Sequence, residues 1–152
     1  MNHRLDRLGW GLVVLATLNL GNGVWMLADP RLWYTELPAG VPDFGPYNEH
    51  FVRDLGGAFL AFALALGWAA FRPLWRPPLV IVTAAFFVLH AAGHIFDTAR
   101  GFVSASHWWI DLPSVYAPAL LLAALGVHLR KVHDTSNPAR TADLGTKPSL
   151  RR

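Results

Sequence analysis

The sequence predicts an all-α integral membrane protein, a four-helix bundle in up-down-up-down order with both termini in the cytoplasm. The chain of 152 residues is 53% hydrophobic and 15% charged, which is more apolar than an ordinary soluble domain of this size. Its charges are also segregated, because four long stretches contain no Asp, Glu, Lys or Arg: 8–28, 55–71, 77–96 and 112–129. Each approaches the roughly 20 residues that a helix needs to cross a bilayer.

The four expected spans form one transmembrane domain over residues 1–130, at about 8–28, 53–71, 77–97 and 111–129. The first span is too long for a signal peptide and lacks an Ala-x-Ala cleavage site near Asp29, so we interpret it as an uncleaved helix. The following loop carries four prolines and cannot be one long helix, although Asp29-Pro30 favours a short helical turn. Residues 131–152 are polar and aperiodic, which predicts a disordered cytoplasmic tail.

The distribution of basic residues predicts the orientation. Ten of the 13 Lys and Arg residues fall in the N-terminal segment, in the connection 72–77 or in the tail, and the opposite loops hold Arg31, Arg53 and Arg100. The positive-inside rule therefore places both termini in the cytoplasm, in a bacterial inner membrane. Because the net charge of +3 arises from these flanks rather than from a basic face, the sequence excludes a nucleic-acid binder.

Small residues recur within the second span. Gly57, Ala61 and Ala65 follow each other at four-residue spacing, which places them on one helical face. Without a hydrophobic drive between helices in lipid, such faces allow close backbone packing. We expect this face to contact a neighbouring helix.

Histidines and carboxylates converge on the outer side of the predicted bundle. Each group follows helical spacing, so its members share a face. The groups are His50 with Asp54, His90 with His94 and Asp97, and His107 with Asp111. The topology brings all three to the same membrane surface, and a histidine as deep as His90 requires a partner.

A transition-metal site is the first interpretation of this convergence. His90 and His94 lie one turn apart and can bind one ion, with His50 or His107 as a further ligand. Asp54, Asp97 or Asp111 would orient a ring from behind. With no cysteine in the chain, imidazole and carboxylate ligands suit copper, zinc, iron or manganese, and the site would support redox chemistry. Whether the protein is an enzyme stays open.

A structural cap is the second interpretation. Here Asn48 caps the second helix with Glu49 in its first turn, Arg53 pairs with Asp97 or Asp111, and Asp111 caps the fourth helix. The protein would then be a non-catalytic membrane module that binds lipid, quinone, a partner subunit or a second copy of itself. A third interpretation is a b-type haem held by His90 with His50 or His107.

Two resemblances accompany these motifs. The stretch from Tyr47 to Leu60, with its Asn-Glu-His-x-x-Arg-Asp box, and the later His90-x3-His94 box resemble small bacterial four-helix membrane proteins of DoxX-like type, which implies the same architecture. The spacing His90-x3-His94-x12-His107 is similar to the Asp-x3-His-x12-His copper ligands in the membrane subunit of particulate methane and ammonia monooxygenases, with His90 in place of Asp. The second resemblance implies copper.

Overall fold

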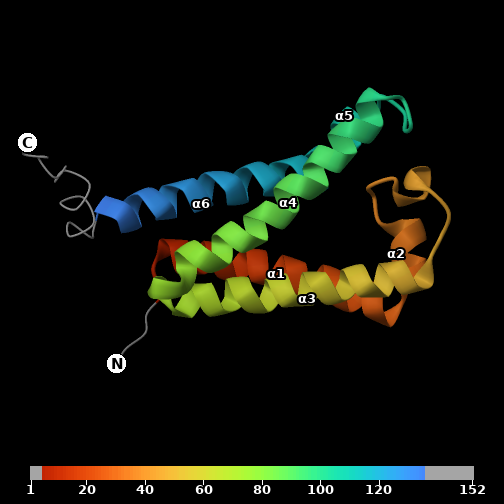
Figure 1. Ribbon diagram of the computed structural model, residues 1–152. Coiled ribbons are helices and arrows are strands. Elements are labelled where there is room, and N and C mark those ends of the chain that lie inside the picture. The colour runs from red at the N-terminus through yellow and green to blue at the C-terminus, as the bar shows by residue number, and fades with distance from the viewer. Residues whose placement is uncertain (1–4, 136–152) are drawn as a thin grey trace, which may run out of the picture.

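The computed structural model describes residues 5–135, apart from the side chains at 133 and 134, and within that range it is helical with no strand (Figure 1). The long helices are α1 (Arg7–Ala28), α3 (Glu49–Phe71), α4 (Arg76–Ala99) and α6 (Ala117–Thr135). The short elements are α2 (Pro30–Glu36), η1 (Val41–Phe44), η2 (Pro73–Trp75), α5 (His107–Ile110) and the π-helical turn η3 (Leu112–Tyr116). This confirms the all-α fold class.

Four helical segments are long and apolar enough to cross a membrane, as the sequence predicts: Arg7–Ala28, Glu49–Phe71, Pro73–Ala99 and Leu112–Val132. Large apolar side chains such as Leu64 and Leu120 are 76% and 70% exposed. Such exposure suits side chains that face lipid tails. The protein is a multi-pass membrane protein whose four long helices form a bundle.

Side chains at the helix starts explain where three helices begin. Asp6 accepts a hydrogen bond from the backbone N–H of Gly9 and caps α1, and Asp29 caps α2, which has Pro30 at its first position. Asn48 accepts from the N–H of Phe51 and caps α3. Each oxygen satisfies an N–H group that has no partner within its own helix. The predicted Asn48 cap and the predicted turn after Asp29 are confirmed.

Helices α1 and α3 make the most extensive helix contact. They approach most closely at Gly23 and Gly56: a Cβ atom on Gly23 would lie 2.8 Å from the Gly56 carbonyl oxygen. The expectation that Gly57 and Ala61 face a neighbouring helix is wrong, because both are exposed and an added Cβ at Gly57 meets nothing within 4 Å. The close-packed position is one residue earlier, at Gly56. Successive residues of a helix point about 100° apart, so Gly57 faces a different direction.

A buried arginine joins α1, α3 and α4 at the end of the bundle where α1 begins, which we call the terminal end. Arg76 is 7% exposed and donates two hydrogen bonds to the Asp6 carboxylate, at 2.7 and 2.8 Å. It also donates to the carbonyl oxygens of Ala69 and Ala70, at 3.2 and 3.1 Å. The Arg76 guanidinium holds the pKa of Asp6 below its usual value. The Arg76–Asp6 pair stabilises the terminal end, and each of the three guanidinium nitrogens of Arg76 donates at least one hydrogen bond.

The helices form two pairs, α1 with α3 and α4 with α6 (Figure 1). Between the pairs, α3 contacts α4, whereas no contact joins α1 to α6 within residues 5–135. Aromatic rings of α3 and α4 meet near mid-helix, with the Phe62 and Phe86 centroids 4.6 Å apart. Toward the other end, which we call the loop end and which holds α2, η1 and α5, the two pairs diverge (Figure 1).

Helix α6 departs from the prediction at both ends. Before it, Leu112–Tyr116 forms a π-helical turn, and the Asp111 side chain makes no cap bond there. The expected capping role of Asp111 is therefore wrong, because its carboxylate is bound elsewhere. At the far end α6 continues to Thr135, beyond the expected limit at 129. The rest of the predicted disordered tail, residues 136–152, lies outside the described residues.

Candidate functional site

The loop between α1 and α3 folds over the loop end of the bundle. The indole N–H of Trp33 in α2 donates to Asn22 of α1 at 2.8 Å, and the hydroxyl of Tyr34 donates to the Gly45 carbonyl at 2.6 Å. Trp33 also packs into a small core with Met26 and Val52. These contacts hold α2 on the α1–α3 pair and direct η1 toward α4 and α5.

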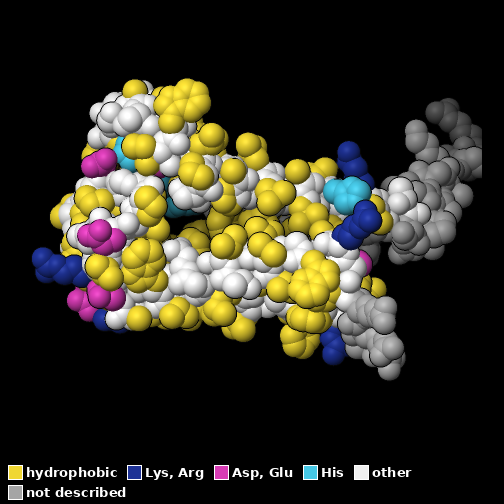
Figure 2. All heavy atoms as spheres, turned by 180° about the vertical axis from the view of Figure 1, so that it is seen from behind, with side chains coloured by type: hydrophobic (Ala, Val, Ile, Leu, Met, Phe, Trp, Pro, Cys, Tyr) yellow, Lys and Arg dark blue, Asp and Glu magenta, His cyan; other side chains and the backbone are white. Residues whose placement is uncertain are grey.

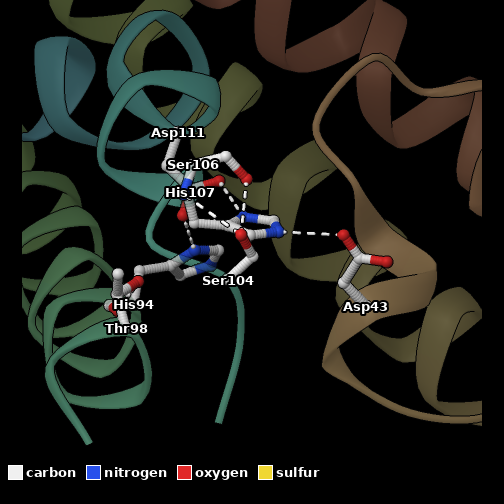
Figure 3. Close-up of polar contacts among 7 residues, drawn as sticks. All are labelled: Asp43, His94, Thr98, Ser104, Ser106, His107 and Asp111. Atoms are coloured by element: carbon white, nitrogen blue, oxygen red, sulfur yellow. Dashed lines mark hydrogen bonds and ion pairs between the residues drawn. The ribbon is translucent and has the colours of Figure 1, made fainter. Parts of the chain in front are cut away.

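A continuous chain of polar contacts links η1 to α4 through α5 (Figure 3). Asp43 in η1 lies 3.0 Å from Nε2 of His107, and Nδ1 of His107 lies 3.2 Å from Asp111. The other oxygen of Asp111 lies 2.8 Å from Nδ1 of His94. His107 and Asp111 are both fully buried. The chain ties together three segments that are far apart in the sequence.

The contacts of His107 favour a proton on each of its two ring nitrogens. Ionised carboxylates only accept hydrogen bonds, and each nitrogen of His107 faces one, Asp43 or Asp111. Burial acts to lower the pKa of His107, but the hydrogen bonds and charges of the two aspartates outweigh it, and the pKa is raised. The arrangement therefore favours the imidazolium form of His107, because the two carboxylates compensate its charge on both sides.

Two close contacts position the His107 ring, and both come from the loop between α1 and α3, which we call the covering loop. Gly40 has a φ of 59°, and a Cβ there would lie 2.8 Å from Cε1 of His107. Both the left-handed backbone and the close approach require glycine. The ring of Phe44 packs against His94 and His107, with centroids 4.5 and 4.9 Å away. The loop thus covers the polar chain with an apolar ring.

His90 lies one turn further into the bundle and is not part of the chain. Its ring stacks on Phe86, with centroids 5.9 Å apart, and meets the edge of the His94 ring at 4.6 Å. Among the hydrogen bonds of the described residues, none involves a ring nitrogen of His90 or Nε2 of His94. These three nitrogens are available to a ligand.

A cavity of about 690 Å³ lies beside these two histidines, between the loop-end halves of α3 and α4 under the covering loop. Its wall is largely apolar, with His90, His94 and Asp97 along α4. The apolar lining includes Trp33, Phe51, Leu55 and Phe86. In the space-filling view the molecule is hollowed between the helix pairs, with histidine inside the hollow and apolar side chains around it (Figure 2). Its volume lies in the usual range for small-molecule pockets.

The remaining predicted site residues lie outside the polar chain. His50 pairs with Asp54 at 3.3 Å on the surface of α3, where their side chains are 88% and 66% exposed. Arg53 pairs with Glu49 at 3.1 Å and donates to the Leu27 carbonyl, rather than pairing with Asp97 or Asp111 as expected. Asp97 pairs with Arg100 at 2.8 Å. It is therefore Asp111, and not Asp97, that contacts His94.

Sequence reasoning missed Asp43 and Phe44. Asp43 lies 64 residues before its partner His107, in a loop rich in proline and glycine, so no helical spacing relates the two. The signal in the sequence was weak: Gly40 and Asp43 stand within an otherwise apolar loop segment. A pairing of this kind depends on how the loop folds back over the bundle.

The described residues contain no group of three or more His, Cys, Asp or Glu side chains arranged to hold a metal ion. His107 has both nitrogens bound to carboxylates, and His50 is on the surface. The predicted ligands that the structure does bring together are His90 and His94.

Comparison with known proteins identifies a family. Residues 7–112 match the family model described as a domain of unknown function, DUF4345. The chain belongs to this family. No curated protein and no solved structure matches the chain. The match to DUF4345 covers α1 through α5, and thus every residue of the polar chain, and it assigns no activity. The comparisons do not show the resemblance to DoxX-like proteins or to monooxygenase subunits.

Proposed function

We propose that this protein binds a lipid-soluble small molecule in the cavity between α3 and α4, with the polar end of the molecule at His90 and His94. The observation that carries the proposal is the combination of an apolar wall of membrane-embedded helices with unpartnered imidazole nitrogens. Ionisable groups within a membrane are costly and require partners. A bound headgroup would supply that partner, while the apolar wall would contact a hydrocarbon chain.

The polar chain has a supporting role in this proposal. Asp43, His107 and Asp111 satisfy one another's hydrogen bonds. Together they hold the covering loop against α5, and we call these three residues the latch. Asp111 also fixes the ring of His94 by accepting a hydrogen bond from Nδ1, which leaves Nε2 available to a ligand. A carboxylate behind a histidine is the usual way to orient the ring.

Photoaffinity labelling of the protein in nanodiscs tests the proposal. The probes are hexadecyl chains that carry a diazirine and end in a hydroxyl, a ketone or a methyl ether. Gly93 lines the cavity, and an added Cβ there meets nothing within 4 Å. Gly93→Leu should therefore place a larger apolar side chain in the cavity and reduce labelling of α3 and α4 by at least about tenfold, which corresponds to roughly 1.4 kcal/mol of binding free energy.

Gly57→Leu is the matched control. Gly57 is also a helical glycine with open space around an added Cβ, but it does not line the cavity. This variant should label like the wild type. If no probe labels the cavity residues, or if Gly93→Leu and Gly57→Leu label equally, the proposed function is wrong.

A transition metal, copper above all but also zinc, iron or manganese, is the second candidate ligand. The observation in its favour is the His94 ring, which Asp111 orients from behind with His90 beside it. Two imidazoles leave positions for external ligands, as reactive metal sites do. Elemental analysis of protein loaded with each metal should then give about one ion per chain, reduced by His94→Ala and unchanged by His50→Ala. Metal-free protein after each loading would contradict this candidate, and a strong Soret band would instead indicate haem.

The loop end faces the outside of a bacterial inner membrane in this proposal. The basis is the excess of Lys and Arg in the segments at the terminal end, Arg72 and Arg76 among them. The cavity then lies in the outer leaflet, within reach of lipids of that leaflet and of a partner subunit or second copy.

A further inference from the structure

We infer that the ligand of the cavity carries a hydroxyl group and donates it as a hydrogen bond to Nε2 of His94, so that the ligand class is a long-chain alcohol or phenol. This inference rests on the proposed function and specifies the headgroup. It follows from the hydrogen-bond roles that the latch imposes on the His94 ring.

The role of Nε2 is set by Asp111. The carboxylate of Asp111 is fully buried and shares its two oxygens between Nδ1 of His107 and Nδ1 of His94. Since a carboxylate accepts, Nδ1 of His94 carries the hydrogen. In a neutral imidazole the other nitrogen is then an acceptor. As a neutral imidazole, His94 therefore requires a hydrogen-bond donor from the ligand at Nε2.

The surrounding charges select against charged headgroups. The Asp111 carboxylate lies directly behind His94, so a fatty acid carboxylate placed at Nε2 would meet like charge. Asp97 is already paired with Arg100, which leaves it less able to compensate an ammonium group. A neutral donor is the headgroup that fits an unpartnered acceptor in an apolar cavity without burying a charge.

Competition between matched lipids tests the headgroup. Unlabelled hexadecanol, hexadecyl methyl ether and a hexadecyl ketone would each compete with the photoreactive methyl ether probe. Hexadecanol should compete at about tenfold lower concentration than the ether, because the ether leaves Nε2 of His94 without a hydrogen-bond donor. In His94→Phe, which keeps a planar ring but has no acceptor, alcohol and ether should compete equally.

The outcomes separate this inference from the proposed function. Equal competition by alcohol and ether in the wild type, or stronger competition by the ketone, would overturn the hydroxyl assignment while labelling of the cavity still supports lipid binding. Absence of labelling by every probe would overturn the proposed function itself. Retained labelling of His94→Phe by the ether probe reports that this variant is folded.

If His94→Phe does not fold, nitrogen NMR of the His94 ring in the wild type gives the answer. Addition of hexadecanol should shift the Nε2 resonance and leave that of Nδ1 nearly unchanged, whereas the ether should shift neither. A hydrogen found on Nε2 in the absence of ligand would contradict the inference.

Discussion

His107 makes the stability of the loop end depend on pH. Its pKa is raised in the folded protein through the two flanking aspartates, Asp43 and Asp111, the second of which also contacts His94. A group with a raised pKa stabilises the folded state fully below its unfolded pKa of about 6.5, and this contribution is lost as the pH rises through the folded pKa. Loop-end stability should therefore fall in alkaline buffer.

Hydrogen exchange of residues 29–48 measures this effect. Protection of these amides should be greater near pH 6 than near pH 9 after correction for intrinsic exchange, and His107→Phe should remove most of the difference. His50→Ala is the control, because the His50–Asp54 pair is on the surface and exposed pairs contribute little. Protection that stays constant between the two pH values in the wild type would show that the latch is not ionic.

At the residue scale, helical spacing predicted the contact between His107 and Asp111, because residues four apart share a face regardless of tertiary structure. It also brought His90 and His94 together. It could not relate Asp43 to His107, because the two are distant in the sequence. It paired His50 correctly with Asp54, but the i,i+4 rule does not say which face of α3 is turned inward, and this pair lies on the surface.

At the scale of a single element, α1 depends on glycine at one position. Gly23 faces the Gly56 carbonyl oxygen so closely that an added Cβ would lie 2.8 Å from it, and this atom belongs to the backbone and cannot rotate away. Gly23→Ala should destabilise the protein by about 1–3 kcal/mol, the usual range for overpacking. Reversible unfolding in mixed detergent micelles measures the change.

Gly21→Ala in the same helix is the control, since an added Cβ there meets nothing within 4 Å. It should be neutral or slightly stabilising, because alanine has the higher helix propensity. Equal stability of Gly21→Ala and Gly23→Ala would mean that α1 and α3 separate readily, contrary to their close packing.

The boundaries of α1, α3 and α4 followed closely from charge-free stretches and proline positions, whereas α6 is displaced at both ends. In lipid, a backbone must satisfy its own hydrogen bonds, and a helix does so. The packing faces did not follow. Gly56 and Gly57 are adjacent and both small, so composition alone does not decide which of them contacts α1. The π-helical turn before α6 also has no signature beyond Pro113, which is its second residue, and Pro118, which lies two residues after its end.

For the whole molecule, the sequence predicted four apolar helices and the gathering of polar side chains at one end. It did not predict that the helices divide into two pairs. Within residues 5–135, α6 packs beside α4 and does not pack against α1. That division depends on the bulky side chains that lie between the pairs, such as Phe62 and Phe86 near mid-helix. The cavity follows from the division, and it is therefore a property of packing rather than of any motif.

The two helix pairs are joined at three levels along the bundle. Arg76 donates to Asp6 at the terminal end, Phe62 packs against Phe86 near the middle, and the contacts from Asp43 to His94 join the pairs again at the loop end. From Phe86 to Ala99 the helical rise gives a length of about 20 Å, so a tilt of α4 by about 5° would move its loop end by roughly 2 Å. The contacts from Asp43 to His94 therefore determine how wide the cavity is at its loop end.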